Sequence, residues 1–184
     1  GRPQLMFRHV KKLHFVGIGG IGMSGIAELL LNLGFKIAGS DINDSAVIEK
    51  LKNKGAEVAQ GHAAENVTDA DVLVYSSAVQ KDNPEVIAAQ KKGIPVIRRA
   101  EMLGELIALK ETSIGVAGTH GKTSTSSMVG TMLSQAKLDP TLVVGGLVRN
   151  IDTNSLLGTG DIIVVEADEF DRSFLSLQPT IAII

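Results

Sequence analysis

Two glycine-rich loops constrain the fold of this chain more than any other feature of its sequence. Residues 17–22 follow the apolar run 13–16 and precede a helical pattern, and residues 118–124 follow the apolar run 113–117 and precede another. A glycine loop between a strand and a helix is typical of α/β domains, where it places the helix N-terminus against a phosphate group. The sequence therefore predicts an α/β fold with two separate phosphate-binding turns.

The second loop has the chemistry of a nucleoside triphosphate site. Unpaired N–H groups and the dipole of a helix N-terminus attract phosphate, Lys122 adds a full positive charge, and the Thr123 hydroxyl can hold Mg²⁺. A strict P-loop has a glycine where this chain has Val116, so the match is a variant. We predict ATP as the ligand, and a glycine-rich turn without a ligand is the alternative. The predicted cofactor-binding residues are Gly118, Thr119, His120, Gly121, Lys122, Thr123 and Ser124.

Composition excludes several classes of partner. The net charge of −2 and the aromatic content of 3% give neither the attraction nor the stacking surface of a nucleic-acid-binding protein. The chain has no cysteine, which excludes disulfides and cysteine-based zinc sites and fits a cytoplasmic protein. No apolar run reaches the roughly 18 residues that span a bilayer, and residues 1–12 lack the apolar core of a signal peptide. We therefore expect no nucleic-acid partner, no membrane insertion and a cytoplasmic location.

Apolar runs and helical patterns alternate along the first half of the chain, which predicts a Rossmann-like parallel sheet covered by helices. Small polar turns at residues 39–41 and 76–78 follow predicted strands, at the sheet edge where open α/β sheets bind ligands. The helical pattern 100–109 leads to a fresh strand, so we place a domain boundary after Lys110. The predicted strands are 13–18, 35–38, 72–75 and 95–97, and the predicted helices are 23–33, 45–54 and 84–92.

The second domain, residues 111–184, is predicted to be part of a P-loop-type α/β domain, after a first domain of residues 1–110. Its helix is expected at residues 123–136, where Met128, Met132 and Leu133 follow helical spacing. No polar residue follows the last apolar run, residues 181–184, so we expect the sequence to stop within this domain. The predicted strands are 114–117, 142–144, 162–166 and 181–184.

The first glycine loop fits the pattern G-x-G-x-x-G, and Asp41 follows Gly22 by 19 residues, at the end of the next predicted strand. In dinucleotide-binding folds an acidic residue at this place reaches a ribose hydroxyl. Such a loop requires only a diphosphate at the helix N-terminus, so a UDP-sugar fits as well as NAD or FAD. These residues alone leave both kinds of ligand open.

An acidic cluster follows the apolar strand 162–165. Glu166 has the place of a carboxylate that holds Mg²⁺ against the β- and γ-phosphates from a strand beside a phosphate loop. We predict Thr123 and Glu166 as the metal ligands. A solvated acidic turn is the alternative, and it is the favoured interpretation for the later acids Asp168, Glu169 and Asp171.

Taken together, the two loops and the acidic cluster resemble the Mur ligases, and the resemblance covers nearly the whole chain. It accounts for Val116, because the phosphate loop of that family is Gly-Thr-x-Gly-Lys-Thr/Ser. His120 is similar to the residue of the alanine-adding member, whereas Phe170 stands where relatives tend to have serine. The segments that carry the resemblance are residues 14–27, 39–41, 118–123 and 166–169.

The resemblance implies a three-domain, ATP- and Mg²⁺-dependent ligase that joins L-alanine to UDP-N-acetylmuramate through an acyl phosphate. The first domain would bind the UDP-sugar and the second ATP, while the third helps to bind the amino acid. This chain would hold the first domain and part of the second, so we expect it to bind ligands without turnover. Lys122 and Glu166 are the implied catalytic residues. The implied substrate-binding residues are Gly19, Gly20, Ile21, Gly22, Asp41, Ser76, Ser77 and Arg99.

Three alternatives stay open. An NAD-dependent oxidoreductase would use the first glycine loop but would leave Lys122 and Glu166 unexplained. A cell-wall recycling ligase would join a whole peptide to the same UDP-sugar. A non-catalytic binding module would describe a chain that binds its ligands and does nothing more. The sequence defines no oligomeric state.

Overall fold

The computed structural model describes residues 9–20, 22–109, 112–118, 120–144, 147–149, 160–166 and 180–184. The chain divides into two compact units, Gly1–Met102 and Leu103–Ile184, and each is described by itself. The division falls inside helix α4 (Arg99–Leu109), whereas the predicted domain boundary follows residue 110. Which ligand belongs to which domain stays a prediction at this stage.

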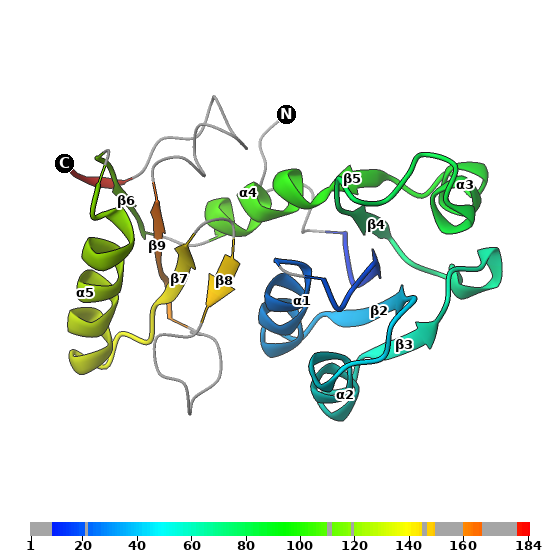
Figure 1. Cartoon of the computed structure of the whole chain (residues 1–184), viewed down its shortest axis with the longest axis horizontal. Coiled ribbons are helices and arrows are strands. Elements are labelled where there is room, and N and C mark those ends of the chain that lie inside the picture. The colour runs from blue at the N-terminus through cyan, green and yellow to red at the C-terminus, as the bar shows by residue number, and fades with distance from the viewer. Residues whose placement is uncertain are drawn as a thin grey trace. The chain divides into compact units, whose positions relative to one another are not determined.

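The first unit is built on a parallel five-stranded sheet with the order β3-β2-β1-β4-β5 (Figure 1). This is the order of a Rossmann-type half sheet, which confirms the predicted α/β class. The carboxyl ends of all five strands lie at one edge. Strand β3 was not predicted from the sequence. The strands are β1 (Lys12–Val16), β2 (Lys36–Asp41), β3 (Glu57–Gln60), β4 (Val72–Tyr75) and β5 (Val96–Arg98).

Helices connect these strands, and their starts follow from local sequence. Ser45 caps α2, because its side chain accepts a hydrogen bond from the Ile48 N–H, and Asn83 caps α3 in the same way through the Glu85 N–H. Helices α1 and α2 pack against each other on one side of the sheet, and α3 lies on the other side (Figure 1). The bounds are α1 (Met23–Asn32), α2 (Ala46–Asn53), the short 3₁₀ helix η2 (Ala64–Asn66) and α3 (Pro84–Lys91).

The core of the first unit lies on both faces of the central strands. Leu13, Phe15 and Val16 of β1 are fully buried, as expected for a parallel strand covered by helices on both faces. Between the sheet and α3, one apolar cluster consists of Val16, Val67, Leu73, Val86, Ala88 and Ala89. The site at the sheet edge is therefore supported by a closely packed scaffold.

The second unit contains a five-stranded sheet with the order β10-β6-β9-β7-β8. Its pairs are parallel except β7 with β8, which is antiparallel at the sheet edge, and β8 was not predicted. Helix α5 packs over β6, β9 and β7 (Figure 1). The elements are β6 (Thr112–Val116), α5 (Lys122–Gln135), β7 (Thr141–Val144), β8 (Leu147–Arg149), β9 (Ile162–Glu166) and β10 (Ile181–Ile183).

The predicted helix of the second unit is confirmed, but the face that packs against the sheet does not contain two of its apolar residues, Met128 and Met132. Met128 and Met132 are 64% and 63% exposed. Val129 and Leu133 pack against a cluster of Ile114, Val116, Leu142 and Val164, while the small residues Ser126 and Gly130 are buried. Small side chains on this face allow the helix to approach the sheet closely.

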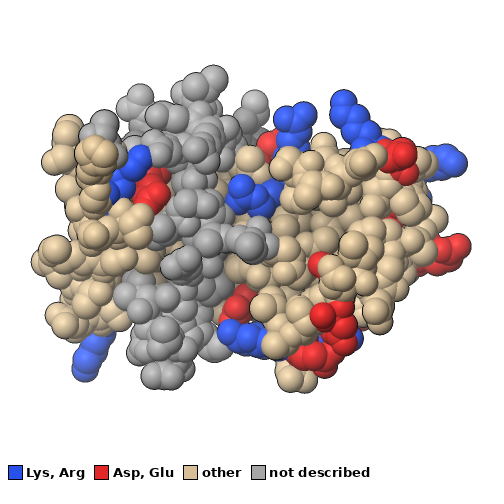
Figure 2. Space-filling model, viewed as in Figure 1, with Lys and Arg blue, Asp and Glu red and all other residues tan. Residues whose placement is uncertain are grey.

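On the face shown in Figure 2, both Lys and Arg side chains and Asp and Glu side chains occur over the first unit. Within the described ranges, no helix is long and apolar enough to cross a membrane.

Candidate functional site

The first glycine loop joins the carboxyl end of β1 to helix α1, and its backbone is tied to the neighbouring strand β2. The Ser40 carbonyl accepts hydrogen bonds from the Gly17 N–H (2.8 Å) and the Ile18 N–H (3.0 Å). The Gly19 N–H donates to Asp41 Oδ2 at 2.9 Å. Gly22 is the N-cap of α1 and provides no side-chain cap, and the Gly20 carbonyl accepts from the Met23 N–H (3.1 Å) and the Ser24 N–H (3.2 Å). The positive end of the α1 dipole still lies at this turn, where it favours an anionic ligand.

Gly19 is the position in this loop where a side chain is excluded. A Cβ atom there would lie 2.9 Å from Ile48 Cδ1 and 3.0 Å from Asp41 Oδ2. These distances are shorter than ordinary contacts, so a residue with a Cβ atom here must displace the Ile48 and Asp41 side chains or shift the loop. Gly20 and Gly22 lie in the same turn, and Ile21 lies outside the described residues.

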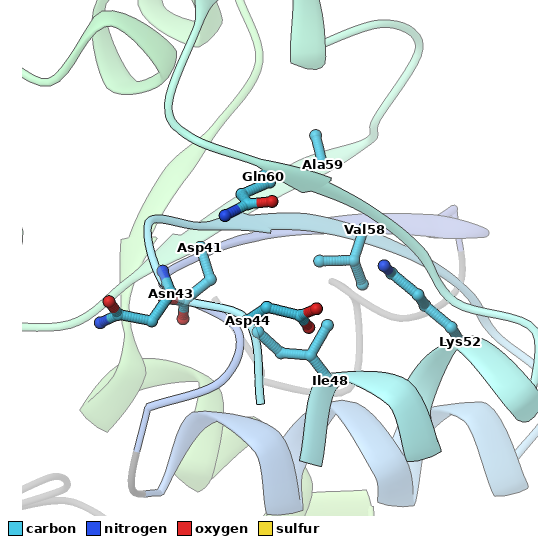
Figure 3. Close-up of a pocket in the computed structure, with 8 residues that line it drawn as sticks. All are labelled: Asp41, Asn43, Asp44, Ile48, Lys52, Val58, Ala59 and Gln60. Atoms are coloured by element: carbon cyan, nitrogen blue, oxygen red, sulfur yellow. Dashed lines mark hydrogen bonds between the residues drawn. The ribbon is translucent and has the colours of Figure 1, made fainter. Parts of the chain in front are cut away.

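The predicted role of Asp41 is to contact a ribose hydroxyl, and in the structure its carboxylate accepts hydrogen bonds from two backbone N–H groups. Its Oδ2 accepts from Gly19, and its Oδ1 accepts from the Asn43 N–H at 3.0 Å. The carboxylate thus joins the glycine loop to the β2–α2 connection, and lone pairs remain on both oxygens for a ligand. A small pocket lies beside it (Figure 3), lined by Asp41, Asn43, Asp44, Ile48, Lys52, Val58, Ala59 and Gln60.

The remaining predicted substrate residues lie on other strand ends of the same edge. Ser76 and Ser77 follow β4, and the Val79 N–H donates to the Ser76 carbonyl at 3.0 Å, forming a turn. Arg99 begins α4 directly after β5. In the described part of the chain, neither serine side chain has a hydrogen bond to the glycine loop. A role of these three residues in binding stays a prediction.

The second glycine loop joins β6 to α5. Gly121 is the N-cap of α5 and has a φ of 76°, a left-handed conformation that favours glycine. It offers no side-chain cap, and the positive end of the α5 dipole lies at this loop. His120 is exposed, whereas Thr119 lies outside the described residues.

Thr123 and Glu166 are brought together by parallel pairing of β6 with β9. The register places Val116 opposite Glu166, so the phosphate loop and the acid leave neighbouring strands at the same edge. The Thr123 hydroxyl donates to Glu166 Oε1 at 2.8 Å, and Glu166 is only 6% exposed. The sequence predicted these two residues as a pair of metal ligands, and the fold places them in contact.

This pair supplies two oxygen ligands of the kind that Mg²⁺ prefers. No group of three or more His, Cys, Asp or Glu side chains suited to a metal ion occurs among the described residues. Mg²⁺ at a nucleotide site needs no such group, because phosphates and water complete its coordination. Asp168, Glu169 and Asp171 lie outside the described residues.

A buried polar cluster near the first loop was not predicted. Glu85 lies in the first turn of the predicted helix 84–92, yet it is 0% exposed and contacts His14 and Ser40, which are 1% and 0% exposed. Burial acts to raise the pKa of Glu85, but hydrogen bonds from His14, Ser40 and His62 outweigh it and hold that pKa below 4.5. The sequence gives little indication of this cluster, because its two histidines and its acid lie in three distant segments.

The chain is similar to known proteins over most of its length. The model of the Mur ligase family, catalytic domain, matches residues 12–111. The UDP-N-acetylmuramate--L-alanine ligase of Myxococcus xanthus (strain DK1622) is 57% identical over 185 residues, covering 100% of this chain and 39% of that protein. The chain therefore spans about two fifths of the length of the curated relatives it matches.

Two solved structures show the same relationship in three dimensions. UDP-N-acetylmuramate-alanine ligase from Thermotoga maritima has a TM-score of 0.68 and 31% identity, covering 84% of this chain and 37% of its own. UDP-N-acetylmuramate:L-alanyl-gamma-D-glutamyl-meso-diaminopimelate ligase from Neisseria meningitides has a TM-score of 0.71 and 31% identity. The match covers 94% of this chain and 59% of the Neisseria chain. Because the family model matches more than half of the residues, the chain belongs to the Mur ligase family.

Proposed function

We propose that the chain is the UDP-sugar- and ATP-binding part of a ligase that joins L-alanine to UDP-N-acetylmuramate. The observation that carries the proposal is the contact between Thr123 and Glu166, 2.8 Å apart behind a Gly-Lys-Thr loop. A glycine-rich turn without a ligand would not require a buried carboxylate from the next strand at this hydroxyl. The contact is the arrangement expected for an ATP site with its metal ion.

In the second unit, Gly118 to Ser124 would surround the phosphates of ATP. Backbone N–H groups at the start of α5 would donate to phosphate oxygens, and the Lys122 ammonium would neutralise charge on the β- and γ-phosphates. Thr123 and Glu166 would hold Mg²⁺. The bound ion supplies further neutralisation of phosphate charge.

In the first unit, the glycine loop would bind the diphosphate of UDP-N-acetylmuramate through the start of α1. Asp41 would contact the nucleoside with the lone pairs left over from its two backbone bonds. Ser76, Ser77 and Arg99 are further candidates on the same sheet edge. Asp41 thus acts in two ways, because it shapes the loop and faces the ligand.

The proposed reaction has two steps. An oxygen of the muramoyl carboxylate attacks the γ-phosphorus and ADP leaves, which gives an acyl phosphate. The amine of L-alanine then attacks the acyl carbon, inorganic phosphate leaves, and the amine loses a proton. Phosphoryl transfer of this kind depends on positioning and charge neutralisation, which is the part that Lys122 would perform. We expect this chain to bind both nucleotides without turnover.

Sequence similarity favours L-alanine over a peptide as the added group. The Myxococcus relative, named for L-alanine, is 57% identical, whereas the Neisseria peptide-adding ligase is 31% identical. NAD-dependent oxidation is a weaker candidate, because it gives no role to Lys122 or Glu166. A cytoplasmic location fits the lack of cysteine.

Calorimetric titration of the chain tests the proposal. We expect UDP-N-acetylmuramate and magnesium ATP to bind at separate sites and NAD to give no heat of binding. ADP release that depends on L-alanine would contradict the expectation of binding without turnover. Binding of NAD without a response to the UDP-sugar would replace the ligase proposal by the dinucleotide one.

A further inference from the structure

Four polar side chains form a cluster under the ligand edge of the first unit. Glu85 begins α3, His14 lies in β1, Ser40 lies in β2, and His62 follows β3. Glu85 Oε1 contacts His14 Nε2, and Glu85 Oε2 accepts from the Ser40 hydroxyl at 2.6 Å. His62 Nδ1 lies 2.8 Å from Ser40 Oγ and 3.0 Å from Glu85 Oε2. Three of the four side chains are fully buried, and the His62 side chain is 19% exposed.

The positions of the protons follow from this geometry. Glu85 Oε2 accepts from the Ser40 hydroxyl, and hydrogen bonds also hold the pKa of Glu85 below its usual value against the effect of burial, so we take Glu85 as an acceptor. The Ser40 proton is used toward Glu85, which leaves no donor on Ser40 for His62. His62 must therefore carry its proton on Nδ1 and donate it to Ser40 and Glu85. Nε2, on the far side of the ring, is turned away from the buried cluster.

The cluster is connected to the ligand edge by two short routes. The Ser40 carbonyl holds the N–H groups of Gly17 and Ile18, so Ser40 lies directly behind the glycine loop. Gly61, next to His62, donates its N–H to the Asp41 carbonyl at 2.7 Å. Because β1, β2 and β3 are parallel, His62 leaves the sheet at the same edge as the glycine loop and Asp41.

We propose that Glu85 is a positioning residue for the nucleoside diphosphate site of the first unit. It fixes His62 with Nδ1 inward, so that Nε2 faces the ligand edge in one tautomer, and it fixes Ser40 behind the glycine loop. The proposal rests on the proposed function, because it takes the diphosphate of a UDP-sugar as the ligand. Glu85 itself does not touch the ligand and acts through His62.

The tautomer of His62 gives a direct test on the unmodified chain. Imidazole ¹⁵N shifts should show His62 protonated at Nδ1 in the ligand-free protein. A ring protonated only at Nε2 would overturn the proposal. This measurement needs no substitution, so it remains decisive if a Glu85 variant fails to fold.

A double-mutant cycle with UDP as the probe separates positioning from general support of the fold. We expect Glu85→Gln to weaken UDP binding about tenfold, because an amide cannot accept from both sides. His62→Ala should weaken binding to a similar degree, and Glu85→Gln in the His62→Ala background should cause little further loss. Glu65→Gln, at an exposed site on η2, is the matched control and should leave UDP affinity unchanged.

The outcomes distinguish the two proposals. Equal loss from Glu85→Gln in both backgrounds would show that Glu85 acts on the fold and not through His62. Unchanged UDP affinity in His62→Ala would remove the ligand role of His62 and with it the positioning role. If the unmodified chain does not bind UDP at all, the proposed function fails, and the positioning role of Glu85 fails with it.

Discussion

The two glycine loops have the same local plan and different supports. Each follows a parallel strand and ends at a glycine N-cap in the left-handed conformation, with no side chain to cap the helix. The first loop is held by hydrogen bonds from its N–H groups to the Ser40 carbonyl and the Asp41 carboxylate of the same unit. In the second, the described side-chain contact is between Thr123 and Glu166, two residues that would both hold Mg²⁺.

The difference separates two uses of a helix N-terminus. In the first unit, groups that shape the loop also belong to the folded scaffold, so damage to the loop should lower both stability and affinity. In the second unit, the groups in contact are predicted ligand groups, so their loss should lower affinity more than stability. Paired measurements of both quantities can break or sharpen this comparison.

The largest effect is expected from Gly19→Val. The added side chain meets Ile48 and the Asp41 carboxylate, so these side chains or the loop must move, and over-packing of this kind costs about 1–3 kcal/mol. We expect the free energy of unfolding in urea to fall by that amount and UDP binding to be lost. Ala136→Val, which enlarges a side chain at an exposed position of the second unit, is the control. Full stability together with full UDP affinity would show that the loop is not held as described.

The next effect is expected from Lys122→Met. Loss of the ammonium removes a charge-assisted contact to phosphate, so affinity for magnesium ATP should fall about a hundredfold. The melting temperature should stay close to that of the unmodified chain. Lys91→Met, at an exposed position on α3, should change neither quantity. A large loss of stability in Lys122→Met would remove the contrast between the loops.

A smaller effect is expected from Thr123→Val. It deletes the hydroxyl that contacts Glu166, and we expect magnesium ATP to bind about tenfold more weakly, with a small change in stability. Thr131→Val on the same helix is a close control, because the Thr131 hydroxyl bonds only the Ser127 carbonyl among the described contacts. Equal ATP affinities for the two variants would contradict the predicted metal-binding role of Thr123.

The smallest effect concerns acid stability of the first unit. Burial raises the pKa of Glu28, but hydrogen bonds and charges from Lys54 and Lys50 outweigh it and hold that pKa below 4.5. This stabilisation is complete above pH 4.5 and is lost as the pH falls through the lowered pKa. Glu28→Gln should therefore flatten the loss of stability on acidification, by less than about 1 kcal/mol. Hydrogen exchange of the β1 and β2 amides measures it, and a slope identical to that of the parent would contradict the role of Glu28.

Local patterns were sufficient to predict much of the fold. The alternation of apolar runs and helical spacing gave the α/β class, and helix α3 starts at Asn83 and Pro84 as predicted. Thr123 and Glu166 could be paired from the sequence, because the phosphate loop and the acid at a strand end can each be recognised within one short segment. Their hydrogen bond confirms that the two lie together, while their ligands stay predictions.

The features that sequence reasoning missed depend on distant contacts or weak strand patterns. β3 has a single large apolar residue, Val58, and lies at a sheet edge, so its sequence gives little strand signal. The partners of Glu85 are 71, 45 and 23 residues away, at His14, Ser40 and His62. No local pattern contains such separations. The carboxylate therefore looked like an ordinary charged residue in the first turn of a helix.

The place of β1 in the sheet has a consequence for synthesis of the chain. Among the described strands it is the earliest to leave the ribosome, yet it lies at the centre, paired with β2 on one side and β4 on the other. Until β4 (Val72–Tyr75) has been made, one row of N–H and C=O groups along β1 has no strand to pair with. An open strand edge attracts other chains, so the nascent protein is vulnerable to aggregation in this interval.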